Sequence, residues 1–206
     1  MSIASAVSIL RRTPTRAALT AAAILLSSTH ALAAQTSAPQ ARTWELRFTS
    51  GAFLPTGNQR NFLKDAQVSA AQVSWVVRPS LALTGTFGWA RSRDIHTVDA
   101  PKLDVFTSDV GIEARSAKWF ADRAVTFSPF VGLGAGARSY NYRKLDVDAT
   151  NNLAGYGTAG GELGIGRVGV RLEVRDYASG FKPLVGAGKS DTRNDVVMMV
   201  GLRLTK

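Results

Sequence analysis

The sequence predicts an all-β chain that folds as an eight-stranded antiparallel up-and-down transmembrane β-barrel. Apolar and polar residues alternate with a period of two through most of the chain after residue 42, and the connections between these segments switch between long and short. Because successive side chains of a strand point to opposite faces, the alternation gives each predicted strand one apolar and one polar face. No segment after residue 34 keeps a helical period.

The residues before the first strand have the pattern of a secretory signal peptide. The charges in residues 1–33 are all positive, an apolar run occupies 17–26, and small residues at 31–33 end the segment. The apolar run is about half of the ~20 residues that a membrane-spanning helix needs, which favours a cleaved signal over an N-terminal anchor helix. We therefore expect a signal peptide at 1–33, a short polar leader at 34–42 and a barrel domain at 43–206.

The first four strands are predicted at about 43–55, 66–77, 81–91 and 103–116. In the first, one face holds Trp44, Leu46 and Phe48, and the other holds Glu45, Arg47 and Thr49. The second is rich in small residues and alternates less cleanly. The third has an apolar face of Leu81, Leu83, Phe87 and Trp89. In the fourth, Phe106, Val110 and Ile112 oppose Asp109, Glu113 and Arg115.

The last four strands are predicted at about 125–142, 153–165, 168–177 and 194–206. The first two of these are rich in glycine and alanine. The third has the clearest alternation in the chain, with Val168, Val170, Leu172 and Val174 opposing Arg171, Glu173, Arg175 and Tyr177. The fourth has an apolar face of Val196, Met198, Val200, Leu202 and Leu204. Pairing this final strand with the first one closes the predicted barrel.

The connections between the predicted strands differ in length according to their position. The long ones are 57–65, 92–102, 143–151 and 179–194, the segment 117–124 is intermediate, and the short ones are 78–80 and 166–167. In an up-and-down meander, alternate connections lie at opposite ends, so the long ones gather at one rim. Outer-membrane barrels have this asymmetry, with short periplasmic turns and longer outer loops.

Three features favour apolar faces that point outward into lipid over the inward apolar face of a soluble, lipocalin-like barrel. Charged residues within the strands are mainly arginine and glutamate, whereas the lysines lie in loops. Inside an enclosed lumen, the planar guanidinium group of arginine can form forked hydrogen bonds to a carboxylate. The polar faces are also rich in small residues, as a narrow filled lumen requires. Aromatic residues near the strand ends resemble interfacial belts. They are Trp44, Trp75, Trp119 and Phe120 at one rim, and Trp89, Tyr140 and Tyr142 at the other.

The charged residues of the polar faces form our candidate site. We expect them to pair in a network that fills the lumen, since an eight-stranded barrel encloses such groups almost completely. The residues are Arg47, Glu113, Arg115, Glu162, Arg171, Glu173, Arg175 and Arg203. A narrow ion pathway gated by the same pairs is the alternative.

Three segments resemble the outer-membrane β-barrel domain family, which includes barrels of the OmpA, OmpX and OmpW types. They are residues 128–136 (SPFVGLGAG), 160–164 (GGELG) and 171–177 (RLEVRDY). The likeness extends over most of 43–206. It implies a monomeric barrel in the bacterial outer membrane, inserted by the barrel-assembly machinery and surrounded by outer-membrane lipids and lipopolysaccharide. The final strand departs from the family by ending on a lysine instead of an aromatic residue.

The composition argues against several functions. The chain has no cysteine, which excludes disulfides, thiol nucleophiles and thiolate zinc sites. One of its two histidines, His30, lies in the predicted signal peptide, and the remaining His96 cannot form a histidine-rich metal site alone. We therefore expect no metal and no cofactor. The chain has no basic run with a stacking motif, so nucleic-acid binding is not predicted.

Two local motifs have simpler explanations than ligand binding. Residues 155–160 match the pattern G-x-G-x-x-G, but the glycine-rich segment after them cannot form the helix that a dinucleotide site needs. Residues 146–151 begin like a calcium loop, but Asn151 and Gly157 occupy the positions of its glycine and its bidentate glutamate. We expect a strand and a solvated loop tip, respectively.

The predicted function is therefore that of a non-enzymatic integral outer-membrane protein with a structural or surface-interaction role. The first alternative is a narrow pore or transporter for small solutes. The second is a lipid-modifying enzyme that uses His96 with a serine such as Ser92. Cations of the long loops could meet lipopolysaccharide phosphates, but acidic residues separate them along the sequence, which predicts no single-sign patch. These cations are Arg60, Lys64, Arg91, Arg93, Arg143, Lys144, Lys182, Lys189 and Arg193.

Overall fold

The computed structural model of the protein describes residues 43–119, 124–146, 149–181 and 191–205. The predicted signal peptide and leader, as well as Phe120, lie outside the described residues. Among the described residues, no helix is both long enough and apolar enough to span a membrane.

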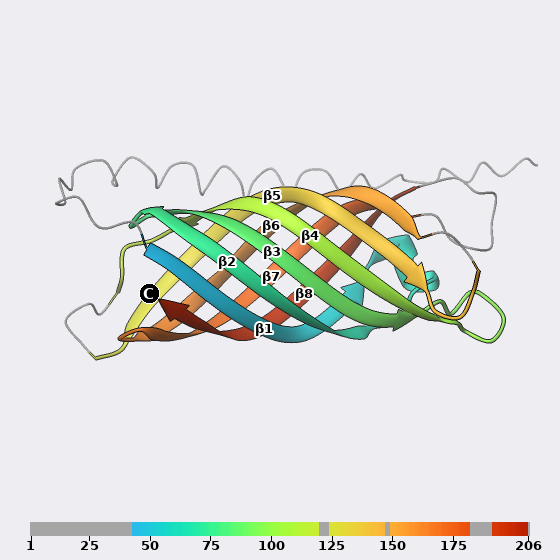
Figure 1. Ribbon diagram of the computed structural model, residues 1–206, viewed down its shortest axis with the longest axis horizontal. Coiled ribbons are helices and arrows are strands. Elements are labelled where there is room, and N and C mark those ends of the chain that lie inside the picture. The colour runs from blue at the N-terminus through green and yellow to red at the C-terminus, as the bar shows by residue number, and fades with distance from the viewer. Residues whose placement is uncertain (1–42, 120–123, 147–148, 182–190, 206) are drawn as a thin grey trace, which may run out of the picture. The chain divides into compact units, whose positions relative to one another are not determined.

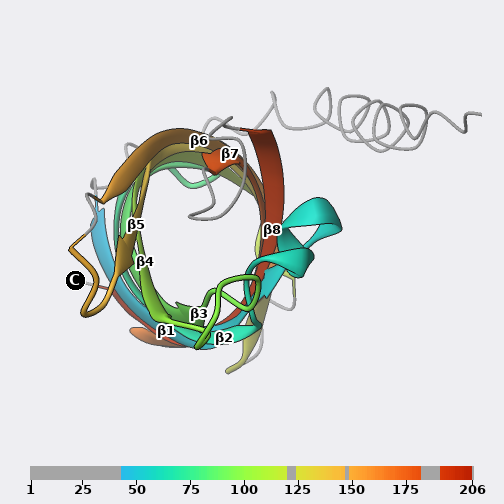
Figure 2. The same ribbon diagram turned by 90° about the vertical axis from the view of Figure 1, so that its right-hand side faces the viewer.

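The described chain is a closed barrel of eight strands, which confirms the predicted fold class (Figure 1). Each strand pairs antiparallel with its neighbours in sequence, and the first pairs with the last. The strands are β1 (Thr43–Pro55), β2 (Ala66–Arg78), β3 (Leu81–Arg93), β4 (Lys102–Arg115), β5 (Thr126–Tyr142), β6 (Thr150–Ile165), β7 (Val168–Phe181) and β8 (Asp191–Thr205). A 3₁₀ turn, η2 (Gly57–Asn61), follows β1 and lies beside β8 (Figure 2).

The connections lie at the two ends as the meander requires. Those after β2 and β6 are tight, and Gly166 in the second has a φ of +58°, a left-handed conformation that glycine adopts without strain. Strands β6, β7 and β8 reach further toward the long-loop end than predicted. The pairing of β7 with β8 continues through Ser179↔Arg193 and Phe181↔Asp191. The backbone ladder of these two strands therefore extends past residues 177 and 194, where the predicted alternation of apolar and polar residues stops.

The two faces of the sheet are divided as the alternation predicts. Large apolar side chains cover the outer face, including Val110 (70% exposed) and Leu133 (67% exposed). Charged side chains point inward and are buried, including Arg47 (0% exposed) and Arg171 (1% exposed). The barrel therefore has its apolar surface outside and its charges inside.

The lumen nearer the long loops is filled mainly by a cluster of apolar and aromatic side chains. This cluster includes Phe53, Leu103, Val105, Tyr140, Tyr142, Tyr156, Tyr177, Val197 and Met199. The prediction that Tyr140 and Tyr142 form an outer interfacial belt is therefore wrong. Arg138, Tyr140 and Tyr142 occupy every second position of β5, so their side chains all point inward, and both tyrosines are buried.

Glycines of β5 and β4 make room for one ring of this cluster. A β-carbon at Gly134 would lie 2.6 Å from the ring of Tyr156, and one at Gly111 would meet the hydroxyl of the same tyrosine. Gly157 on the outer face of β6 has no neighbouring atom within 4 Å of such a carbon. The tyrosine therefore occupies space that only glycine leaves open.

We expect Gly134→Ala to lower the free energy of unfolding by about 1–3 kcal/mol, because the added carbon overpacks the lumen. Gly157→Ala is the matched control and should leave stability unchanged or slightly higher. Urea titration of the detergent-folded protein, followed by tryptophan fluorescence, measures both. An equal effect of the two substitutions would contradict the tight packing around Tyr156.

Candidate functional site

The charged cluster in the lumen begins with residue pairs two positions apart on single strands. Side chains at i and i+2 share a face of a strand, so such pairs point into the lumen together. Strand β1 supplies Glu45 and Arg47, β4 supplies Glu113 and Arg115, and β7 supplies Arg171, Glu173 and Arg175. Glu162 of β6 and Arg203 of β8 complete the lumen network, as we call these nine residues.

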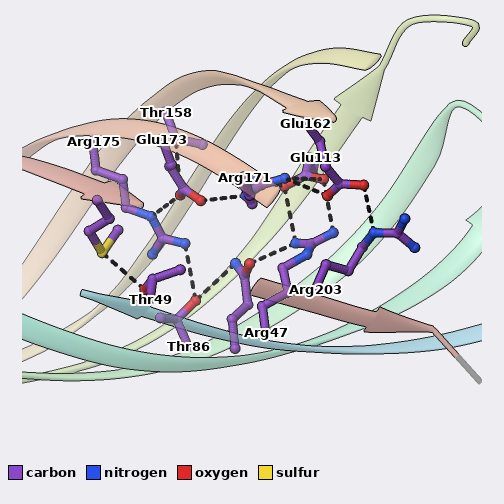
Figure 3. A network of polar contacts seen from close by, with 12 residues as sticks. Arg47, Thr49, Thr86, Glu113, Thr158, Glu162, Arg171, Glu173, Arg175 and Arg203 are labelled. Atoms are coloured by element: carbon purple, nitrogen blue, oxygen red, sulfur yellow. Dashed lines mark hydrogen bonds and ion pairs between the residues drawn. The ribbon is translucent and has the colours of Figure 1, made fainter. Parts of the chain in front are cut away.

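Glu113 is the centre of the lumen network and joins three strands across the barrel (Figure 3). Its carboxylate accepts a hydrogen bond from Nη2 of Arg171 at 2.5 Å and one from Nε of Arg115 at 2.7 Å. Nη2 of Arg47 lies 3.4 Å from the same carboxylate. Because these arginines come from β7, β4 and β1, this single glutamate links opposite walls of the barrel.

Glu45 anchors the end of the lumen network nearer the short turns. It accepts a forked pair of hydrogen bonds from Arg115 at 2.9 and 2.8 Å, and a third from Arg47 at 2.6 Å. Arg203 lies 3.7 Å from Glu45 and 2.6 Å from Glu162, so it connects β8 to both β1 and β6. Planar forks of this kind fix geometry as well as charge.

The other end of the lumen network is built around Glu173 and Arg175. Glu173 accepts hydrogen bonds from Nε of Arg171 at 2.7 Å, from Nε of Arg175 and from the hydroxyl of Thr158 at 3.0 Å. Arg175 also lies 3.6 Å from Asp109, to which Tyr177 donates its hydroxyl at 2.6 Å. The charged region therefore continues directly into the aromatic cluster.

Neutral side chains connect the two ends of the lumen network. The amide of Gln72 accepts from Arg47 at 2.6 Å and donates to the hydroxyl of Thr86 at 3.1 Å. Arg175 donates to that same hydroxyl at 3.3 Å. The guanidinium of Arg171 lies 3.3 Å from the ring centre of Phe130, a cation–π contact. Hydrogen bonds thus run from β1 through β2 and β3 to β7.

The formal charges of this region cancel. The five arginines of the lumen network face its four glutamates and Asp109, which lies beside Arg175. Removing so many charges from water is costly unless every charge is paired and hydrogen-bonded, and here each carboxylate contacts at least one guanidinium. The arrangement can hold the strands in register and fill the lumen.

All eight residues of the predicted candidate site come together in this network. Glu45 and Asp109, which lie on the predicted polar faces, were not among the predicted site residues, and neither was the buried pair Arg138–Asp195. That pair lies within the aromatic cluster, where the guanidinium of Arg138 is 4.3 Å from the ring centre of Tyr177. Asp195 lies within the predicted final strand, on the face opposite Val196 and Met198, so the alternation already places its side chain inside.

Residues of two long loops cover the aromatic cluster at its outer end. Gln59 of η2 and Leu63 are buried, and Gln59 donates to the hydroxyl of Tyr140 at 3.4 Å. Asp94 is fully buried and accepts hydrogen bonds from the hydroxyl of Tyr142 at 2.8 Å and from the backbone of His96 at 3.0 Å. An internal cavity of about 20 Å³ lies beneath, enough for about one water.

The remaining candidate residues are held by local contacts. The ring of His96 packs against Phe62 at 5.0 Å between centroids, whereas Ser92 points inward and donates to the carbonyl of Lys64 at 2.5 Å. Residues 155–160 lie within β6, as expected. Part of the calcium-like segment, 147–148, lies outside the described residues. In the described ranges, no group of three or more acidic or histidine side chains is placed to hold a metal ion.

We expect Glu113→Gln to lower the free energy of unfolding by about 3–5 kcal/mol, because the buried Arg47 and Arg171 and the partly buried Arg115 lose their shared counter-charge. Asp65→Asn, at an exposed loop position, should change it by less than about 0.5 kcal/mol. Urea unfolding of the two detergent-folded variants compares them. Similar small effects would mean that the lumen network does not stabilise the barrel.

Comparison with known proteins supports the same architecture. No family model and no curated protein matches the sequence at a significant level. The crystal structure of Neisserial surface protein A (NspA) matches with a TM-score of 0.56 and 7% identity, covering 78% of this chain and 96% of that one. The solid-state NMR structure of outer membrane protein AlkL in DMPC lipid bilayers matches with a TM-score of 0.50 and 14% identity, covering 84% and 94%. This chain therefore has the closed eight-stranded barrel fold of outer-membrane proteins.

Proposed function

We propose that the protein is an integral barrel of the bacterial outer membrane whose closed lumen makes it a rigid scaffold for surface interactions of its long loops. The observation that carries this proposal is the inverted distribution of side chains. Arginines and glutamates fill the interior, and large apolar side chains cover the exterior. A soluble barrel has the opposite arrangement.

The apolar outer surface indicates that lipid surrounds the barrel. Contiguous apolar side chains on neighbouring strands are unusual on monomeric proteins in water. Here Val110 on β4, Leu133 on β5 and Leu153 on β6 are each more than half exposed. Near the short-turn end, Trp44 and Trp75 stack at 6.0 Å between ring centroids, as aromatic residues at a membrane interface would. The signal peptide proposed for residues 1–33 would supply the export that this location requires.

The filled interior favours a scaffold function over that of a pore or transporter. The lumen network crosses the barrel from β1 to β7 through Glu113, and the aromatic cluster fills the lumen above it. An eight-stranded barrel has an interior just wide enough for side chains to fill it or to hold one small ligand, and here side chains fill it. The long loops are then the parts of the protein that remain for recognition.

A charge introduced into the outer apolar surface tests the membrane environment. Leu133→Arg, near the middle of β5, should lower the free energy of unfolding in phospholipid vesicles by about 2–4 kcal/mol. Val98→Arg is the control, because Val98 is 85% exposed in a loop. Its effect should stay below about 0.5 kcal/mol. If both variants unfold like the wild type and the protein stays soluble without detergent, the membrane proposal is wrong.

Planar-bilayer conductance tests the closed lumen. We expect the reconstituted protein to show no discrete channel openings, because paired charges and packed rings fill its interior. A larger porin measured in the same bilayers is the positive control, since its lumen is an aqueous channel. Reproducible single-channel steps from the wild-type protein would favour the pore alternative.

A further inference from the structure

We propose that the outer face of β3, β4 and β5 at the long-loop end binds the phosphates of lipid A, the anionic glycolipid anchor of lipopolysaccharide. This inference rests on the proposed outer-membrane location. The site consists of Arg91, Arg93, Lys102, Asp104 and Arg143, which we call the rim cluster.

The strand register brings the four cations of the rim cluster together. Arg93 of β3 is paired with Lys102 of β4, and the backbone N–H of Arg143 donates to the carbonyl of Lys102 at 2.9 Å. Two register steps toward the barrel centre, Arg91 is paired with Asp104. All four cations are exposed, and the strand parity places those of β3 and β4 on the outer face.

Asp104 organises the two arginines that flank it. It points outward, yet it is only 6% exposed because neighbouring side chains cover it. Its carboxylate lies 2.5 Å from Nε of Arg143 and 3.7 Å from Nε of Arg91, and it accepts a hydrogen bond from the indole of Trp89 at 3.1 Å. The guanidinium of Arg91 also lies 4.7 Å from the ring centre of Trp89.

This arrangement leaves the phosphate-binding ends of both arginines available. Each arginine contacts Asp104 through Nε, and within the described residues neither terminal nitrogen of Arg91 or Arg143 forms a hydrogen bond or ion pair. Guanidinium groups bind phosphate through two parallel N–H donors. Four cations against one carboxylate leave three positive charges in excess.

The position of the rim cluster, at the edge of the outer apolar surface, favours a lipid headgroup over a soluble anion as its ligand. Below Trp89 on the same face, Phe87 and Phe106 stack at 6.2 Å between centroids, and the apolar surface begins there. An anion held by the cluster would thus lie directly above a surface suited to acyl chains. Lipid A matches both features, because it joins two phosphate groups to acyl chains, and each phosphate carries roughly −1.5 to −2 charges.

The test uses the full chain refolded into phosphatidylcholine nanodiscs, with binding of fluorescent lipid A measured by anisotropy. Arg93→Gln with Lys102→Gln removes two cations that pair with no described carboxylate. The control, Arg78→Gln with Arg167→Gln, removes two exposed cations from the short-turn end. We expect the rim double variant to bind lipid A about tenfold more weakly and the control to stay within about twofold of wild type.

Two further probes identify the ligand. Lipid A without phosphates should bind about tenfold more weakly than the phosphorylated form, and millimolar inorganic phosphate should not displace the latter. Equal losses in both double variants, no loss in either, or displacement by inorganic phosphate would each overturn the inference. Heat-modifiable gel mobility verifies folding in every sample. A folded, bilayer-inserted protein without lipid A binding leaves the proposed function standing, whereas a failure to insert removes both.

Discussion

The pairing of β1 with β8 is the constraint on which the rest of this structure depends. It leaves no free sheet edge, so the backbone hydrogen bonds of every strand are made within the chain, as a lipid environment requires. Closure with only eight strands also makes the lumen narrow. Every second residue of each strand must then fit into that lumen, and any charge placed there must find its partner inside the same molecule.

The lumen network satisfies this constraint and keeps the inner face of each strand chemically distinct from its outer face. If both faces were apolar, a one-residue register slip, which exchanges the inner and outer faces of a strand, would cost little free energy. With Arg171, Glu173 and Arg175 on one face of β7, such a slip would expose three charges to lipid. The desolvation cost of these charges is offset only in the correct register, where Glu113 and Glu173 meet their arginines.

The sequence was sufficient to predict the strands, their faces and the eight members of the candidate site, because alternation with period two determines which residues share a face. It was not sufficient to predict partners across the lumen. These depend on the relative height of residues on strands far apart in sequence, which the tilt and stagger of the closed sheet determine. The contact of Arg47 with Glu113, 66 residues apart, is an example. Tyr140 and Tyr142 were misplaced because their strand alternates glycines with small residues, which obscures its inward parity.

The same geometry explains why the rim cluster has no signature in the linear sequence. Between Arg91 and Lys102 the chain contains Asp94 and Asp99, and these acids interrupt the run of cations. In the fold the side chain of Asp94 points inward and is buried against Tyr142, so this acid does not lie on the outer surface. Asp104 has the opposite parity and stays among the cations, where it binds two arginines through Nε. Strand alternation therefore separates charges that are mixed along the chain, and it leaves an excess of positive charge at the depth where a lipid headgroup would lie.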